Sequence, residues 1–349
     1  MKFVFYSILS VLIFTQTTLA KQFESVETYQ NSFAITRTST CLIQHKLGNI
    51  IISNWNKDSI SVKLIVKIKS RKKEIADKYL KSISSRIIQN MDSISIVTLF
   101  NEEWKNHKKI DFEITYLIQS PAYLNYDISN KWGDLSLAKA TGKLNIHLHH
   151  GKLTAQELRF SNNQELNQIK LDYSTAQINY CNYASIDIKY GDFKLNEGKA
   201  LKLDAIYTTV NIDKLQAIYF SGKYGSFSLD TAEIVNIDAK YLSANIQYLN
   251  RKLISKIRYG GLHVDNISPF FSTIDIEASF GNTQLLIHPD AVYKINAEIE
   301  HGSLDLPKKA NIDRNVTNKG ESTTEIIGPL SKPRTGEVNI DVDYGNVKL

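Results

Sequence analysis

The stretch that decides the fold runs from residue 190 to residue 240 and reads YGDFKLNEGKALKLDAI (190–206), YTTVNIDKLQAIYFSGK (207–223) and YGSFSLDTAEIVNIDAK (224–240). Each of the three lines begins with tyrosine, and Tyr241 and Tyr259 continue the series at spacings of 17 and 18 residues. A unit this short cannot bury a core of its own, so it must stack on copies of itself. The repeat therefore predicts an all-β fold built as a stack of coils.

The spacing of apolar residues inside one unit predicts strands. Counting from Tyr207, apolar residues fall at Val210 and Ile212 and again at Ile218 and Phe220, which is the two-residue period of a strand with one buried face. An amphipathic helix would need three- and four-residue spacing. The glycine that often follows the tyrosine suggests a tight corner, because glycine permits a positive φ angle. We expect a single-stranded parallel β-helix, a solenoid with rungs of about 17 residues.

The recurring aromatic position extends in both directions from this stretch. The predicted ladder residues are Trp132, His150, Tyr173, Tyr190, Tyr207, Tyr224, Tyr241, Tyr259, Phe280, His301 and Tyr344. Because each would occupy the same corner of its rung, they should stack as a structural column. We assign them a packing role and assign no catalytic residue.

The first 20 residues have the composition of a signal peptide. Lys2 supplies a positive charge, residues 3–15 are largely apolar, and small residues up to Ala20 suit a signal peptidase. The apolar run is short for a spanning helix, which needs roughly 20 residues. We therefore expect an exported chain, in the periplasm or at the cell surface, with no transmembrane segment in its mature part.

The rest of the chain divides into four parts. Residues 21–130 read as a β-rich region with one helix at about 72–90, inferred from the four-residue spacing of Ile75, Tyr79, Ile83 and Ile87. This β-α-β insert should cap the open end of the solenoid, whose rungs fill residues 131–305. Residues 306–335 read as a mobile loop, and residues 336–349 as the last rung.

Other candidate sites give weak signals. Cys181 occupies a repeat position that is apolar elsewhere, which favours a buried core residue over a disulfide with Cys41, although the pairing stays open. His147, His149 and His150 cluster without an evident third metal ligand, and the acidic pairs Glu102/Glu103 and Asp111/Glu113 read as solvated charges. We predict no metal and no cofactor.

Several short motifs resemble a known family. Leu47-Gly-Asn-Ile50 followed by Trp55-Asn-Lys-Asp-Ser-Ile-Ser-Val62, the strand Ile114-Thr-Tyr-Leu-Ile-Gln-Ser-Pro-Ala122, and Trp132-Gly-Asp-Leu135 resemble the turns of the "putative adhesin" family of bacterial envelopes. This family is related to auto-transporter adhesin head (GIN) domains. The resemblance covers residues 40–349 and implies a single-stranded β-helix in an exported protein. It carries over no catalytic residue.

These observations lead to two functional hypotheses. The first is an exported, non-enzymatic cell-envelope protein, adhesin-like or a structural and interaction module. The second is a carbohydrate-active β-helix enzyme or glycan-binding protein, which a groove with three or more convergent charged side chains would favour. The partner stays open between an envelope glycan, an acidic polymer and another envelope protein. The export signal disfavours nucleic acid.

Overall fold

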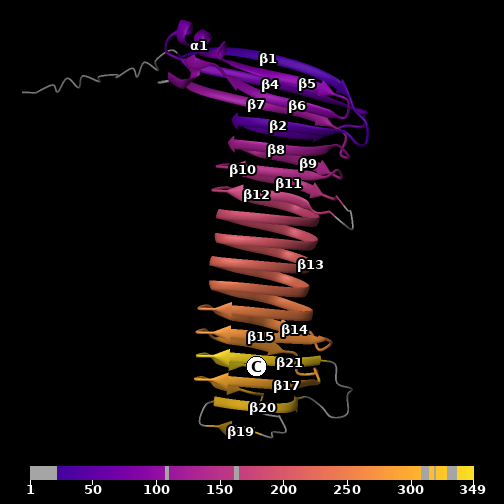
Figure 1. Ribbon diagram of the computed structural model, residues 1–349, viewed down its shortest axis with the longest axis vertical. Coiled ribbons are helices and arrows are strands. Elements are labelled where there is room, and N and C mark those ends of the chain that lie inside the picture. The colour runs from indigo at the N-terminus through magenta and orange to yellow at the C-terminus, as the bar shows by residue number, and fades with distance from the viewer. Residues whose placement is uncertain (1–21, 107–109, 161–164, 308–313, 318–319, 328–335) are drawn as a thin grey trace, which may run out of the picture.

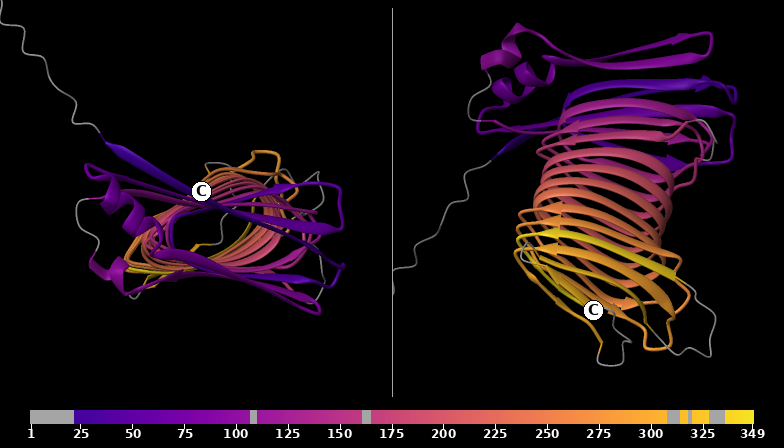
Figure 2. Two further views of the ribbon diagram at one scale, coloured as in Figure 1. Left: turned by 90° about the horizontal axis from the view of Figure 1, so that it is seen from above. Right: turned by 60° about the horizontal axis from the view of Figure 1, so that its bottom comes forward.

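The computed structural model describes residues 22–106, 110–160, 165–307, 314–317, 320–327 and 336–349. These residues form one sheet of 22 strands, in which most neighbouring strands run parallel. The sheet curves until it almost closes on itself, and successive turns of the chain lie above one another along the long axis (Figures 1 and 2). The proposed signal peptide, residues 1–20, lies outside the described residues.

Each turn of the chain, called a coil below, contributes one strand before the aromatic corner and one strand after it. Strands on one wall lead to the corner: β2 (Thr40–Leu47), β8 (Asn125–Trp132), β10 (Leu144–His149), β12 (Asn167–Asp172), β15 (Thr273–Ser279), β21 (Gly336–Asp343) and β17 (Tyr293–Glu300). Strands on the other wall lead away from it: β3 (Asn49–Asn54), β9 (Leu135–Ala140), β11 (Lys152–Leu158), β14 (Leu262–Ile267), β16 (Thr283–Ile287), β22 (Asn346–Lys348) and β18 (Ser303–Asp305). We call these the leading wall and the trailing wall.

The middle of the stack is one continuous strand, β13 (Thr175–Arg258), which is 84 residues long and passes through four aromatic corners. It stays continuous because backbone hydrogen bonds between coils do not stop at a corner. Flanking corners show the pattern: Tyr173 donates its N–H to the carbonyl of Lys189 at 2.8 Å, and Tyr259 donates to Ser279 at 2.9 Å. The corners therefore keep the same coil-to-coil spacing as the walls, about 4.7–4.9 Å.

The core lies inside the coils and follows the two-residue period. In the coil that starts at Tyr207, Val210, Ile212, Leu215 and Phe220 are each no more than 2% exposed. Each such side chain contributes roughly 1.5–3 kcal/mol when fully buried. The prediction that Cys181 is a core residue is confirmed, because Cys41 and Cys181 are both buried free thiols. Within the described residues, none of the helices is long and apolar enough to cross a membrane.

The N-terminal end differs from the rest because antiparallel strands cover it (Figure 1). β7 (Asp111–Ser120) pairs parallel with β3 and antiparallel with β4 (Ser59–Ser70), and β4 pairs antiparallel with β1 (Phe23–Ala34). On the leading wall, β6 (Ser93–Phe100) pairs parallel with β2 and antiparallel with β5 (Ile83–Asn90). The 3₁₀ helix η1 (Glu102–Asn106) follows β6.

The expected helix at residues 72–90 is wrong in its second half. Helix α1 covers only Lys73–Leu80, and the following residues form strand β5. The four-residue spacing of apolar side chains thus runs across two different elements. Ser82 closes the helix by donating its N–H to the carbonyl of Tyr79, and the β-branched side chains of Ile83, Ile87 and Ile88 favour a strand that can pair with β6.

The C-terminal end of the stack does not follow chain order. β21 pairs with β15 on one side and with β17 on the other, and β22 likewise lies between β16 and β18. Residues 336–349 are therefore not the last rung, as the sequence suggested, but an inserted coil. The end of the stack is the coil of β17 and β18.

The prediction of a mobile loop at residues 306–335 is also wrong in part, because two strands lie within this range. β20 (Gly320–Ile327) pairs antiparallel with β17 and with the short strand β19 (Arg314–Thr317). The terminal parallel strand thus receives a partner on its outer edge, which would otherwise be free. Residues 308–313, 318–319 and 328–335 lie outside the described residues.

Removal of residues 336–349 should open the C-terminal end of the stack and leave the rest intact. Each coil contacts only its neighbours, so β15 and β17 would lose a shared partner while the coils of β13 would not. We expect fast backbone hydrogen exchange in residues 273–305 of the truncated chain and unchanged exchange in residues 175–240. A synthetic peptide of residues 336–349 should restore protection, whereas the same peptide with Val338→Asp and Ile340→Asp should not. Full protection in the truncated chain would contradict the inserted position.

A buried histidine sits at the N-terminal end of the core. His45 is 4% exposed, and its Nδ1 lies 2.7 Å from Thr98 Oγ1. The hydroxyls continue the chain from Thr98 to Tyr116 at 3.0 Å and from Tyr116 to Ser85 at 2.8 Å. The Nε2 atom of His45 has no hydrogen-bond partner among the described residues. A proton added there would place an unsolvated charge in the core, and burial lowers the pKa of His45 to about 4.

The buried imidazole should make the protein less stable in mild acid. The unfolded chain takes up the proton near pH 6.5 and the folded chain only near pH 4. The contribution of neutral His45 to the free energy of unfolding is therefore fully present above pH 6.5 and is lost as the pH falls from 6.5 to 4. The loss should reach about 3 kcal/mol. Urea unfolding measured at several pH values should give a flatter profile for His45→Asn, which keeps a donor near Thr98. The control His288→Asn, at an exposed histidine, should follow the wild type.

Candidate functional site

The structure places all eleven predicted ladder residues in one column at the corner between the two walls. Consecutive rings are stacked, with centroid distances of 4.8–5.1 Å along the run from Tyr173 to Phe280. The spatial order at the end is Phe280, Tyr344, His301, with distances of 4.9 and 4.3 Å, because Tyr344 belongs to the inserted coil. At the other end His150 lies between Trp132 and Tyr173.

The backbone at the corner differs from the sequence-based expectation. From His150 onward the aromatic residue itself has a positive φ angle, for example 51° at Tyr207 and 56° at Tyr224, whereas the glycine that follows it does not. Among the glycines that the structure describes, only Gly48 and Gly133, in the first coils, have the expected positive φ. The left-handed conformation costs a residue with a side chain roughly 1–2 kcal/mol. A stacked aromatic pair contributes about 0.5–1.5 kcal/mol beyond its buried area, which offsets most of this strain.

The glycine after the aromatic has a different function, which is to let two backbones approach closely. A Cβ atom on Gly191 would lie 1.9 Å from the carbonyl oxygen of Ser174 in the preceding coil. The residues with a side chain at this position, such as Ser174 and Thr208, occupy coils whose neighbours have glycine there. From Gly133 to the end of the column, two adjacent coils therefore never both have a residue larger than glycine directly after the aromatic residue.

The column offers ring edges to solvent rather than ring faces. Its aromatic side chains are about half exposed (Tyr207 is 50% exposed), but between the two ends of the column each face is covered by the ring of a neighbouring coil. A sugar ring that stacks on an aromatic side chain needs a free face. The geometry therefore supports the packing role and not a stacking platform for a ligand.

Substitutions at Tyr207 should separate ring stacking from backbone strain. Tyr207→Phe keeps the stack and should change the free energy of unfolding by less than about 0.5 kcal/mol, whereas Tyr207→Ala removes two stacked contacts and should cost about 1–3 kcal/mol. Tyr207→Gly should be more stable than Tyr207→Ala by about 1 kcal/mol, because glycine relieves the positive φ. Chemical denaturation measures all three, with the exposed Tyr248→Ala outside the column as control. Equal losses for alanine and glycine would contradict the strain.

A groove of about 700 Å³ lies on the outer face of the leading wall, towards the C-terminal end. It spans β13, β15, β21 and β17. The outward residues that line it are Tyr219, Asn236, Asp238, Ile254, Lys256, Asp275, Glu277, Asn296, Glu298, Asn339 and Asp341. Tyr219 is 46% exposed at one end of the groove and belongs to no aromatic stack within the described residues.

Two rows of polar side chains run along the groove, one residue per coil. In the first row Asn296 donates to Asn339 at 2.9 Å, and Asn339 donates to Asp275 at 2.8 Å. In the second row Glu277, Asp341 and Glu298 are paired in register. Lys256 lies 2.6 Å from Glu277, so one carboxylate is neutralised while the groove as a whole stays acidic.

Sequence reasoning missed this groove, although a signal was present. The residue three positions before the aromatic is acidic in most coils, as in Asp187, Asp204, Asp238, Glu277, Asp341 and Glu298. In the sequence these acidic residues are far apart and separated by lysines and asparagines, so they do not form a recognisable cluster. The structure gathers them because the inserted coil brings Asn339 and Asp341 between the coils of β15 and β17.

The clustered histidines towards the other end of the column contact other protein side chains. His147 Nε2 lies 3.1 Å from Asp172 Oδ2, and His150 is held between two rings of the column. Partial burial and the neighbouring His150 lower the pKa of His149. Among the acidic pairs, Glu102 bonds Lys105, Glu103 lies 3.6 Å from Lys78, and Glu113 bonds Lys67 at the surface. Asp111 accepts a hydrogen bond from Gln22.

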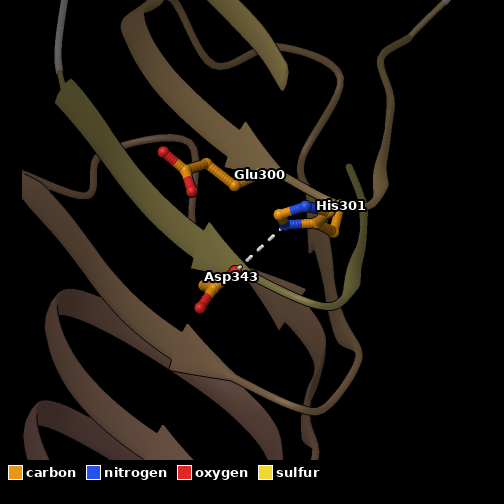
Figure 3. A group of neighbouring side chains, drawn as sticks. All are labelled: Glu300, His301 and Asp343. Atoms are coloured by element: carbon orange, nitrogen blue, oxygen red, sulfur yellow. Dashed lines mark ion pairs between the residues drawn. The ribbon is translucent and has the colours of Figure 1, made fainter. Parts of the chain in front are cut away.

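A second group of titratable side chains lies at the C-terminal end of the column (Figure 3). Glu300 and His301 follow one another at the end of β17, and Asp343 ends the neighbouring strand β21. One ligand atom from each, a carboxylate oxygen or an imidazole nitrogen, lies within 4.8 Å of the other two. His301 Nδ1 is 3.5 Å from Asp343 Oδ1. Sequence analysis placed His301 in the column but did not predict this neighbourhood.

Comparisons with known proteins give structural matches only. Neither a protein-family model nor a curated protein matches the chain. A crystal structure described as a "putative cell adhesion protein" from Clostridium sporogenes matches 92% of this chain and 98% of its own, at 12% identity and a TM-score of 0.20. One described as a "putative adhesin" from Parabacteroides distasonis matches 93% and 96%, at 9% identity and a TM-score of 0.34. Each match extends over more than nine tenths of this chain.

Proposed function

We propose that this chain is an exported, non-enzymatic cell-envelope protein that serves as an adhesin-like contact module in the periplasm or at the cell surface. In this proposal the stacked coils are a single-stranded parallel β-helix. Residues 21–130 contain the cap, in which β1, β4, β7 and α1 lie beyond the coil of β2 and β3, and residues 1–20 direct export. The coils act as a rigid support for one polar outer surface.

The observation that carries the proposal is the groove on the leading wall. Amide and carboxylate groups recur there on four of the coils, and Tyr219 offers an exposed aromatic ring at one end. A few oriented polar groups beside an aromatic side chain suit recognition of a polyhydroxylated ligand. Because the groove is acidic, we propose an uncharged or amino-bearing glycan rather than an acidic polymer.

A carbohydrate-active enzyme is the second candidate, because the groove brings together more than three charged side chains. The backbones that carry the carboxylates in register on neighbouring strands are separated by about one strand spacing, 4.7–4.9 Å. This is close to the roughly 5–5.5 Å found between the two carboxyl groups of retaining glycosidases. Lys256 and Glu277, two of the charged side chains of the groove, neutralise one another in an ion pair. We therefore favour binding without turnover.

A glycan array probed with residues 21–349 tests the proposal. We expect binding of a limited set of glycans, reduced at least tenfold by Tyr219→Ala and by Asn296→Ala, and unchanged by Tyr248→Ala, an exposed tyrosine outside the groove. Release of reducing ends from any bound polysaccharide, abolished by Glu277→Gln or Asp341→Asn, would replace the adhesin-like function with the enzymatic one. Binding that survives the groove substitutions would place the contact surface elsewhere.

A further inference from the structure

We propose that Glu300, His301 and Asp343 bind one divalent transition-metal ion, with Zn²⁺ as the best match. The two carboxylate oxygens and one imidazole nitrogen are ligands that Zn²⁺ accepts, and three protein ligands leave a fourth position for water. The three residues lie next to one another at the ends of two neighbouring strands, β17 and β21 (Figure 3). This inference is independent of glycan binding, and either proposal can fail alone.

The distance between two of the ligand atoms suits a metal ion more closely than a hydrogen-bonded pair, and all three ligand atoms lie within 4.8 Å of one another. Two ligands bound to Zn²⁺ at 2.0–2.2 Å in tetrahedral geometry lie about 3.4 Å apart. His301 Nδ1 and Asp343 Oδ1 are 3.5 Å apart and form no hydrogen bond. Asp343 Oδ1 is shielded from solvent although the side chain as a whole is 46% exposed, and it accepts no hydrogen bond from the described residues. Its ion-pair partner His301, at 3.5 Å, lies beyond the usual hydrogen-bond length, so the shielded oxygen can still accept a ligand bond.

The aromatic column holds the imidazole in place. His301 is the last ring of the column and stacks on Tyr344 with a centroid distance of 4.3 Å and an angle of 3° between the planes. Most coils have tyrosine or phenylalanine at this corner, so the histidine supplies a ligand atom without interrupting the stack. Glu298 and Asp341 lie two residues before Glu300 and Asp343 on the same outer face, and their charges make the surroundings attractive to a cation.

A bound ion would connect the inserted coil to the terminal coil. Glu300 and Asp343 are 43 residues apart in sequence but directly paired in the sheet. Because the site exists only when β21 lies beside β17, an ion bound there stabilises the folded arrangement over any state in which residues 336–349 have left the stack. The site would thus secure the one coil that enters out of chain order.

Isothermal titration of ZnCl₂ into residues 21–349, carrying no histidine tag, tests the inference. We expect one equivalent of Zn²⁺ to bind to the wild type, with affinity at least tenfold weaker in His301→Tyr and in Asp343→Asn. His301→Tyr restores the residue that is commonest in the column, so its fold is preserved, which its melting temperature without metal verifies. The matched control His150→Tyr makes the same change at the opposite end of the column and should bind Zn²⁺ normally.

Hydrogen exchange supplies a second, independent measurement. Zn²⁺ should slow exchange in residues 336–343 of the wild type and of His150→Tyr, and should have no effect on His301→Tyr. CaCl₂ should bind at least tenfold more weakly than ZnCl₂, because a site with an imidazole ligand favours zinc over calcium. Absence of Zn²⁺ binding, equal affinity in His301→Tyr, or Ca²⁺ bound as tightly as Zn²⁺ would overturn the proposal.

Discussion

The structure depends on one constraint, which is that backbone hydrogen bonds between coils continue through the aromatic corner. Tyr344 illustrates it, because its N–H donates to Glu300 while Phe280 donates to Asp343 one coil further on. This fixes the spacing of the corners at the strand repeat, and an aromatic ring at each corner then lies at stacking distance from the next. The backbone geometry thus sets the spacing of the column, and the sequence needs to supply only an aromatic side chain at each corner.

The corner shows how a strained conformation can persist without glycine. A run of ten non-glycine residues with φ angles between 51° and 57° would be costly in an isolated turn. In the stack, every strained residue between the two ends has two backbone neighbours with the same turn and two rings that stabilise it. The glycine that sequence reasoning associated with the positive φ instead relieves a contact with the preceding coil, as at Gly191. The aromatic residue thus carries the backbone strain, and the glycine that follows it permits the close approach of the two coils.

The sequence predicted the coils well because one period governs both burial and stacking. The spacing of tyrosines placed Tyr173 to Tyr259 in one column, and the two-residue period placed Ile212 and Phe220 in the core. It failed where the local pattern was equally compatible with two outcomes. Ile83 and Ile87 satisfy a helical period and a strand period alike, and only pairing with β6 decides between them. The distribution of acidic residues was visible, but its convergence required the order of the coils.

That order is the property a repeat sequence specifies least. The inward residues Val338, Ile340 and Val342 of β21 match Ile295, Ala297 and Ile299 of β17, so either strand could pair with β15 in the same register. Had β17 taken that place, Glu300 would lie beside Ser279 and His301 would stack on Phe280. Asp343 would then lie in the terminal coil, still beside Glu300, and Asn339 would no longer connect Asn296 to Asp275. The Asn296–Asn339–Asp275 row of the groove therefore exists because one coil is inserted, and the order of this row is set by topology rather than by the repeat itself.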